Sequence, residues 1–258
     1  GQSVVLIAPR RFGKTSLVLE ALERLKKQSH FTAFIDVFSN PTIELLSSAI
    51  TEEVLKNHKL HKQFIGAKNS ASKLIQNIKL KAVLDDFQFI VGFADTTKDE
   101  WELMSKSIDF VNEFSEKHKA QMICAYDEFG DIGKFDPKGN LTKLFRSKIQ
   151  QHNNASYIFS GSYESIMQQM FVSSKAPFYR LARIIHLGYM DKEILVKNLA
   201  GRFKKIKLDI SKDLLEDIVG HMKGHPYYCQ LAFQQTILFN ALNNRTPNIN
   251  ELMGQMLA

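Results

Sequence analysis

The sequence contains little cysteine and no long uninterrupted apolar run. Its two cysteines are Cys124, inside an apolar stretch, and Cys229, inside a helical pattern. Two thiols in a chain of 258 residues make no disulfide framework, so we expect both to be small core residues in a reducing cytoplasm. No apolar segment reaches the length of a membrane span and none resembles a signal peptide. We therefore expect a cytoplasmic protein with no membrane partner.

The composition is that of an ordinary globular chain. Hydrophobic residues make up 44% of the sequence and charged residues 24%, which is enough for a sizeable core. The first residue is Gly rather than Met, and the first apolar run begins as early as residue 3. We therefore expect the chain to be a fragment or a processed product with sequence missing upstream.

The formal net charge is +7, and scattered lysines carry much of the excess. These lysines are Lys26, Lys27, Lys56, Lys59, Lys62, Lys68, Lys73, Lys79, Lys81, Lys204, Lys205 and Lys207. The balance fits either an anionic partner, such as nucleic acid or nucleotide, or a solvated lysine-rich surface. The second interpretation is favoured because the sequence has no basic stripe with interleaved aromatic residues.

Strands and helices are predicted to alternate over the first two thirds of the chain. Continuous apolar stretches predict strands at residues 3–8, 32–38, 121–126, 156–160 and 184–189. Apolar periodicity and start signals predict helices at 14–28, from Asn40-Pro41 to about Leu60, from a capping box at 97–100 onward, at 141–151 and at 164–171. The rough alternation within residues 80–94 suggests a hairpin.

After Met190 the pattern predicts helices only, at residues 192–203, 212–220, 227–243 and 248–256. Strands that alternate with helices, followed by helices alone, predict an α/β fold with an attached helical subdomain. The expected division is a core at residues 1–190 and a helical subdomain at residues 191–258.

The first predicted strand runs directly into a loop that opens the first helix. Such a loop aims several backbone N–H groups and a helix dipole at one point, which is an arrangement that binds phosphate. Gly13 permits close approach, Lys14 is expected to reach the β- and γ-phosphates, and the Thr15 hydroxyl to ligate Mg²⁺. The residues predicted to hold the nucleotide are Ala8, Pro9, Arg10, Arg11, Phe12, Gly13, Lys14, Thr15 and Ser16.

The loop departs from the strict phosphate-binding pattern at Ala8, where glycine is usual. Alanine resists a backbone conformation with positive φ. A module that binds nucleotide without hydrolysing it therefore stays open as an alternative. Arg10 and Arg11 either contact phosphate or are solvated, and solvation is favoured.

The third and fourth predicted strands each end in polar residues. Asp127, after the third strand, is expected to hold Mg²⁺ through water, and Glu128 to orient and deprotonate the attacking water. The fourth strand ends in Ser160-Gly161-Ser162. A fourth strand between the two nucleotide-binding strands would place a hydroxyl near the γ-phosphate, and Ser160 is the predicted catalytic sensor. The alternative is that these residues only cap the next helix, with Ser162 as the predicted cap.

Four stretches together resemble the archaeal-type predicted ATPases, a branch of the STAND group of P-loop NTPases close to the AAA+ proteins. They are Ala-Pro-Arg-Arg-Phe-Gly-Lys-Thr-Ser-Leu (8–17), Tyr-Asp-Glu-Phe (126–129), Phe-Ser-Gly-Ser (159–162) and Gly-His-Pro-Tyr-Tyr (224–228). The resemblance implies a three-layer αβα parallel sheet with a C-terminal all-helical lid, and nucleotide bound between them. It also implies that His225 senses the phosphates and that Pro226 packs near the adenine. The alternative is that His225-Pro226 only starts a helix.

One segment departs from the pattern of these ATPases. They usually carry Pro-x-Tyr-Gly-Arg-Ala before the fifth strand, where this chain has Pro-Phe-Tyr-Arg-Leu-Ala at 177–182. Arg180 stands at the glycine position and Leu181 at the arginine position. Arg180 is the predicted catalytic arginine and Arg183 the alternative, although neither matches the pattern fully.

The leading functional hypothesis is a slow Mg²⁺-dependent ATPase that acts as a nucleotide-driven switch in signalling or assembly. Its partner would be another protein or a second copy of the chain. The alternative is a DNA-binding ATPase of the origin-recognition or transposition type, which the net positive charge suggests. A small-molecule kinase would need an acceptor-site signature, and none is recognised. The Asn-Lys-x-Asp guanine signature is also absent, which favours ATP over GTP.

Overall fold

A computed structural model describes residues 2–57 and 99–257 of the chain. These residues group into two compact units. One consists of residues 2–7, 15–57 and 99–186, and contains every strand of the described sheet. The other consists of residues 8–14 together with residues 187–257, and its secondary structure is helical. The first is called here the sheet unit and the second the helical unit.

The sheet unit is built on five parallel strands. They are β1 (Val4–Ile7), β2 (Phe31–Asp36), β3 (Met122–Asp127), β4 (Ala155–Gly161) and β5 (Arg183–His186). The strand order is β2-β3-β4-β1-β5, and every pairing in it is parallel. The sheet confirms the predicted α/β fold, and β4 lies between β1 and β3 as the sensor hypothesis required. All carboxyl ends of the strands therefore meet at one edge.

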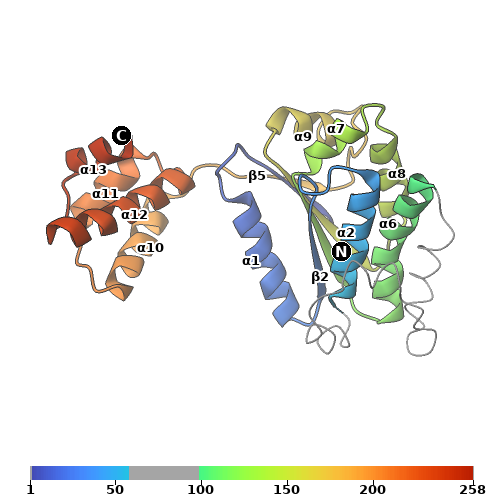
Figure 1. The fold of residues 1–258 in the computed structure, drawn as a ribbon, viewed down its shortest axis with the longest axis horizontal. Coiled ribbons are helices and arrows are strands. Elements are labelled where there is room, and N and C mark those ends of the chain that lie inside the picture. The colour runs from blue at the N-terminus through green and yellow to red at the C-terminus, as the bar shows by residue number, and fades with distance from the viewer. Residues whose placement is uncertain (1, 58–98, 258) are drawn as a thin grey trace. The chain divides into compact units, whose positions relative to one another are not determined.

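The helices of the sheet unit cover both faces of the sheet (Figure 1). They are α1 (Lys14–Lys27), α2 (Ile43–Leu55), α6 (Glu100–Lys117), α7 (Ile132–Phe135), α8 (Asn140–Ile149) and α9 (Glu164–Phe171), with a short 3-10 turn, η1 (Phe129–Asp131). Leu6 of β1 packs with Val18 and Leu22 of α1 on one face. Val5 and Ile7 point to the other face and join the cluster that includes α2, α6, α8 and α9. Burial on both faces explains why the strands read as continuous apolar runs.

Element boundaries differ from the predictions mainly where polar residues decide the first turn. Helix α2 begins after Thr42, whose hydroxyl accepts a hydrogen bond from the Leu45 N–H, so Asn40-Pro41 precedes the helix and does not cap it. Helix α6 is capped by Asp99, which accepts from the Trp101 N–H. Residue 97 of the expected capping box, the predicted hairpin at 80–94 and the end of the second predicted helix at Leu60 lie outside the described residues.

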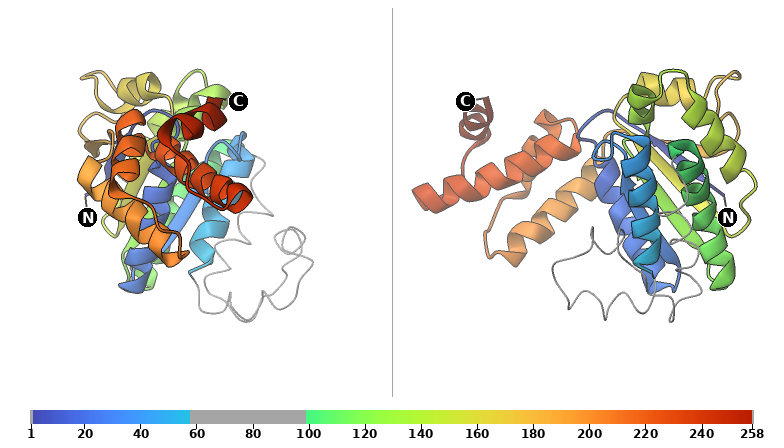
Figure 2. Two further views of the ribbon diagram at one scale, coloured as in Figure 1. Left: turned by 90° about the vertical axis from the view of Figure 1, so that its left-hand side faces the viewer. Right: turned by 45° about the vertical axis from the view of Figure 1, so that its right-hand side comes forward.

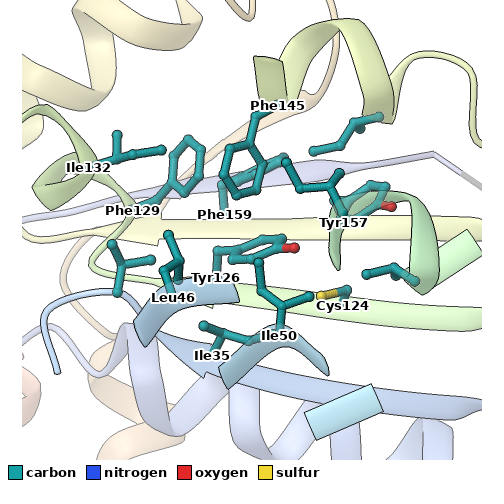
Figure 3. Packing of buried hydrophobic residues seen from close by; sticks show 14 of the residues in the cluster. Ile35, Leu46, Ile50, Cys124, Tyr126, Phe129, Ile132, Phe145, Tyr157 and Phe159 are labelled. Carbon is teal, nitrogen blue, oxygen red and sulfur yellow. The ribbon is translucent and has the colours of Figure 1, made fainter. Parts of the chain in front are cut away.

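A cluster of buried aromatic rings supports the carboxyl edge of β3 and β4. Tyr126, Phe129, Phe145 and Phe159 are all fully buried, and the rings of Phe129 and Phe159 lie 4.7 Å apart. Figure 3 shows these rings between the sheet and the helices that cover it, with Ile50 and Cys124 nearby. Tyr126 and Phe129 flank Asp127-Glu128 in sequence. The acidic pair is therefore anchored on both sides by aromatic side chains whose exposure to water would cost free energy.

The helices of the helical unit pack against one another through two buried apolar clusters (Figure 2). They are α10 (Lys192–Lys205), α11 (Lys212–His221), α12 (Pro226–Asn243) and α13 (Ile249–Leu257). The predicted starts are confirmed: Ser211 caps α11 through the Leu214 N–H, and Pro226 occupies the first turn of α12. Asp191 caps α10 in the same way, through the Ile194 N–H. None of the helices in the described ranges is long and apolar enough to span a bilayer.

The turn between α11 and α12 requires a glycine. Gly224 has a φ of +71°, and a Cβ at this position would lie 2.4 Å from the carbonyl oxygen of Met190. In return the Gly224 carbonyl accepts a hydrogen bond from the Met190 N–H at 2.9 Å. Only glycine allows this close backbone approach, which ties the start of the helical unit to the corner before α12.

Both cysteine thiols should be unreactive in the folded protein. Burial raises the pKa of Cys124 to about 12 and that of Cys229 to about 11. At pH 8 the thiolate fraction of each is then lower than that of an ordinary cysteine by about a hundredfold or more. We expect almost no reaction with an aromatic disulfide reagent at pH 8, and rapid reaction of two thiols in about 6 M guanidinium chloride. Cys124→Ala and Cys229→Ala variants identify the thiol if one reacts quickly in the native state, a result that would contradict the burial seen here.

Replacement of Gly224 by alanine should destabilise the helical unit. The new Cβ would meet the Met190 carbonyl oxygen in a conformation that alanine disfavours, so we expect a loss of about 2 to 4 kcal/mol. The measurement is the midpoint of thermal unfolding followed by circular dichroism. Gly220→Ala is the matched control, because Gly220 lies in α11 and a Cβ added there would meet no atom of another element within 4 Å. It should leave the midpoint unchanged or raise it slightly, and equal midpoints for the two variants would refute the close approach.

Candidate functional site

The loop at residues 8–14 leaves the carboxyl edge of β1 and opens α1. Two of its residues have positive φ, Arg11 at 67° and Gly13 at 81°. The ammonium group of Lys14 donates hydrogen bonds to the carbonyl oxygens of Ala8 and Pro9, both at 2.8 Å. Lys14 is 5% exposed, so the loop curls around a buried cation. This is the concave backbone arrangement that suits a phosphate group.

Alanine at position 8, where glycine is usual, does not need a positive φ in this loop. Ala8 is fully buried and is not among the residues with positive φ. The left-handed conformations fall three and five residues later, at Arg11 and Gly13. Alanine is therefore compatible with the loop, and the departure from the usual glycine carries no conformational penalty at this position.

Thr15 and Asp127 meet across 112 positions of sequence. The Thr15 hydroxyl donates a hydrogen bond to Asp127 Oδ2 at 2.5 Å. Thr15 lies in the first turn of α1 and Asp127 at the end of β3, so the fold brings the two predicted metal-binding residues together. Because a hydroxyl keeps two acceptor lone pairs after donating its hydrogen, Thr15 remains able to ligate a cation.

Asp127 is held by two further donors. Its Oδ1 atom accepts from the Ser160 hydroxyl at 2.5 Å and from the Glu128 N–H at 3.1 Å. Asp127 is only 4% exposed, so these bonds replace the water that a buried carboxylate would otherwise need. The predicted sensor Ser160, 1% exposed, therefore directs its hydroxyl hydrogen to Asp127.

Glu128 has an unusual backbone conformation and a fixed side chain. Its φ and ψ are 49° and 38°, in the left-handed region. Its Oε2 atom accepts from the Ser162 N–H at 2.9 Å, and its Oε1 atom accepts from the Ser162 hydroxyl. The prediction that Ser162 caps the following helix is wrong, because the N-cap of α9 is Tyr163, without a side-chain capping bond.

A second group of predicted residues lies within the helical unit, which includes the loop at 8–14. The Phe12 ring lies 4.5 Å from the ring of His225 and 5.4 Å from that of Tyr189. His225 is the N-cap residue of α12 but makes no side-chain capping bond, and its buried Nδ1 atom has no hydrogen-bond partner among the described residues. His225-Pro226 thus starts a helix and also leaves a ring nitrogen available to a ligand.

The two loop arginines, Arg10 and Arg11, are both exposed. Arg11 does more than face solvent, because its guanidinium carbon lies 4.5 Å from the centroid of the Tyr227 ring in the same unit. This is the geometry of a cation–π contact. Pro9 and Ser16 are also exposed, before and after the turn of the loop.

The segment that carries the predicted catalytic arginine leads into the amino end of β5. In the pairing of β1 with β5, Arg183 lies opposite Val4, at the amino edge of the sheet, whereas the phosphate loop follows Ile7 at the carboxyl edge. Arg180 belongs to the segment that leads to this amino edge, and its guanidinium lies 5.2 Å from the Tyr179 ring. Arg180 therefore precedes the amino end of β5, and its catalytic role stays a prediction.

Arg180 adopts the left-handed backbone conformation that is typical of glycine, the residue usual at this position in the family pattern. Its φ is 61°, a conformation that glycine adopts without strain. Arg146, in α8, donates to the carbonyl oxygens of Pro177 at 2.5 Å and Tyr179 at 3.3 Å and so fixes this segment. The role of Arg146 had no sign in the sequence, because nothing distinguishes it from other arginines of an amphipathic helix.

The contact of Ser162 with Glu128 could have been suspected from the sequence. Its spacing of two from Ser160 places both hydroxyls on one side of a strand.

The donor set at the carboxyl edge fits Mg²⁺. The described residues contain no group of three or more His, Cys, Asp or Glu side chains that could hold a metal by themselves. One hydroxyl and one carboxylate, completed by phosphate and water oxygens, make the all-oxygen set with several waters that Mg²⁺ prefers. The contact between Thr15 and Asp127 places these two groups side by side.

Comparisons with solved structures agree with the fold. The Walker-type ATPase PABY2304 of Pyrococcus abyssi matches 98% of this chain with a TM-score of 0.68 at 19% identity, and 66% of its own length is covered. The ORC2 protein of Aeropyrum pernix, solved as ADPNP–ADP complexes, matches 99% of the chain (62% of its own) with a TM-score of 0.59 at 12% identity. The ORC1 protein of Aeropyrum pernix, solved in complex with DNA, matches 99% (59% of its own) with a TM-score of 0.59 at 11% identity.

These likenesses show the fold, and the chain spans less than two thirds of the length of each structure. No curated protein matches the sequence. A model of the ATPase domain predominantly from Archaea matches residues 2–231, which cover the sheet, the phosphate loop and most of the helical unit. The match confirms the resemblance that the four sequence stretches carried. The chain belongs to the family of ATPase domains found predominantly in Archaea.

Proposed function

We propose that the chain binds ATP with Mg²⁺, hydrolyses it slowly and uses the change of nucleotide state as a conformational switch. The observation that carries the proposal is the hydrogen bond between Thr15 and Asp127 at the carboxyl edge of the sheet. A hydroxyl and a carboxylate at this edge, with Lys14 directly before Thr15 in the sequence, are the parts that a triphosphate and its cation need.

Each group has a role that follows from its position. Lys14 would exchange the carbonyl oxygens of Ala8 and Pro9 for phosphate oxygens, which accept stronger charge-assisted bonds. Mg²⁺, held by a lone pair of Thr15 and through water by Asp127, would neutralise the phosphate charge. Glu128 would accept a proton from the attacking water, for which its carboxylate keeps unused lone pairs.

The switch follows from the residues that share the helical unit with the loop. Phe12 packs against Tyr189 and His225. A change of loop conformation that moves Phe12 would therefore also move His225, at the start of α12. His225 Nδ1, which has no hydrogen-bond partner among the described residues, would gain one from a phosphate oxygen or from the base. Pro226, next to it, would pack near the adenine, and the helical unit would act as the lid. The output would go to a protein partner or to a second copy, to which Arg180 would be available.

A DNA-binding ATPase is the second candidate. The last turn of α10 carries Arg202, Lys204 and Lys205, and Lys207 follows two residues after the helix, in a chain of net charge +7. Basic side chains gathered at one helix end suit a phosphate backbone. Binding of the chain to duplex DNA that weakens steeply as salt rises would support this candidate, and binding that is absent or independent of salt would reject it.

Lys14→Ala should abolish nucleotide binding. The loop backbone encloses the buried ammonium, and its loss leaves the carbonyl oxygens of Ala8 and Pro9 facing the phosphates. We expect the dissociation constant for ATP with Mg²⁺ to rise by about a hundredfold or more, measured by isothermal titration calorimetry. Lys27→Ala is the control, since Lys27 is exposed at the end of α1. Retention of tight binding by Lys14→Ala would reject the phosphate-loop assignment.

Glu128→Gln should retain ATP and stop its hydrolysis. Glutamine is nearly isosteric with glutamate but cannot accept a proton at neutral pH, so kcat should fall by about a hundredfold to ten-thousandfold. Phosphate release gives the rate, and filter binding of labelled nucleotide shows that ATP stays bound. Glu23→Gln, an exposed position on α1, is the control with the same change of charge. Wild-type turnover by Glu128→Gln would show that Glu128 is not the base.

A further inference from the structure

Ser162 makes two contacts with the carboxylate of Glu128, one to each oxygen. The backbone N–H donates to Oε2 at 2.9 Å, and the side-chain hydroxyl donates to Oε1. Rotation of the carboxylate, or a change of its rotamer, would break both bonds together. Because the acceptor is ionised, each of these bonds is stronger than one between two neutral groups. Ser162 thus fixes Glu128 far better than a single contact would.

The position of this contact follows from the strand register. The last residues of β3 and β4 that pair in the ladder are Tyr126 and Phe159. Beyond them β3 leaves the sheet through the left-handed backbone of Glu128, while β4 continues to Gly161. The Ser162 N–H therefore has no strand partner on this side, and the Glu128 side chain supplies the acceptor that the backbone no longer offers.

The segment that carries Ser162 is itself held in place. A Cβ on Gly161 would lie 2.7 Å from the sulfur atom of Met167, so α9 packs directly on the backbone between the two serines. Ser160 on one side of Gly161 donates to Asp127, and Ser162 on the other side donates to Glu128. The two carboxylates at the end of β3 are thus each held by a serine at the end of β4.

We infer that Ser162 is a positioning residue that holds Glu128 in the orientation from which it takes a proton from water. The inference rests on the proposed role of Glu128 as the base. A general base is effective only when its carboxylate is held within a small range of angles and distances from the water. Ser162 acts through Glu128 and needs no contact with the nucleotide.

Ser162→Ala removes the hydroxyl bond and keeps the backbone bond. We expect kcat to fall by about tenfold or more with KM for ATP unchanged, because loss of a group that orients a catalytic residue typically costs about tenfold to a hundredfold. Ser162→Thr keeps a hydroxyl and should restore most of the rate. Ser147→Ala is the matched control, since Ser147 is exposed in α8 and bonds the carbonyl of Leu144 in its own helix. It should leave kcat unchanged.

A double-mutant cycle separates positioning from a structural role. In the Glu128→Gln background, single-turnover hydrolysis of labelled ATP should be no slower with Ser162→Ala than without it, because the base is already lost. A comparable further loss would show that Ser162 acts independently of Glu128 and would overturn the inference. An unchanged or increased kcat for Ser162→Ala in the wild-type background would overturn it as well.

Failure of the positioning role of Ser162 can be distinguished from failure of the proposed base, Glu128. If Ser162→Ala does not fold, Ser162→Cys preserves the volume with a weaker donor and is measured in the same cycle, with the same expectations. If Glu128→Gln retains wild-type turnover, the proposed base is wrong and the inference fails with it. If Glu128→Gln is inactive while Ser162→Ala and Ser162→Cys are fully active, only the positioning role of Ser162 is overturned.

Discussion

The hydrogen bond between Thr15 and Asp127 is the constraint on which the site depends. It joins the first turn of α1 to the end of β3, two elements whose contacting residues lie 112 positions apart in the sequence. The parallel sheet makes this contact possible, because all its strands end at the same edge. The aromatic rings buried next to the acidic pair keep this edge of the sheet in place, because exposing Phe129 or Phe159 to water would cost free energy.

Much of the architecture could be predicted from the sequence. Strands buried on both faces leave continuous apolar runs, and all five predicted strands are present within a few residues of the expected positions. Ser211 and Pro226 marked their helix starts because capping and first-turn proline are local effects. The phosphate loop and Asp127 were recognisable because their residue types and their order along the chain reflect the chemistry of a triphosphate.

The errors arose where tertiary contacts decide. Ser162 has the composition of a helix cap, but its hydroxyl goes to Glu128, whose backbone had to turn left-handed first. The role of Arg180 stays a prediction, and the sequence did not indicate that Arg183, three residues later, pairs with Val4 at the amino edge of the sheet. Ala8 looked like a defect, but the positive φ values of the loop lie at other residues. The register of β5 and the φ values of the loop have no local signal in the sequence, and for Ser162 the only signal was its spacing of two from Ser160.

The strand between the phosphate loop and the acidic pair has a consequence for how this sequence can vary. β4 contributes two hydroxyls and one glycine at its end, and that glycine lies against a methionine sulfur atom. A side chain at Gly161 would clash with Met167 of α9, and loss of the hydroxyl of Ser160 or Ser162 would leave a carboxylate without that donor. The tripeptide Ser160-Gly161-Ser162 is therefore fitted on one side to α9 and on the other to Asp127 and Glu128. We expect natural variation here to be restricted by volume even where the chemistry would tolerate a substitution.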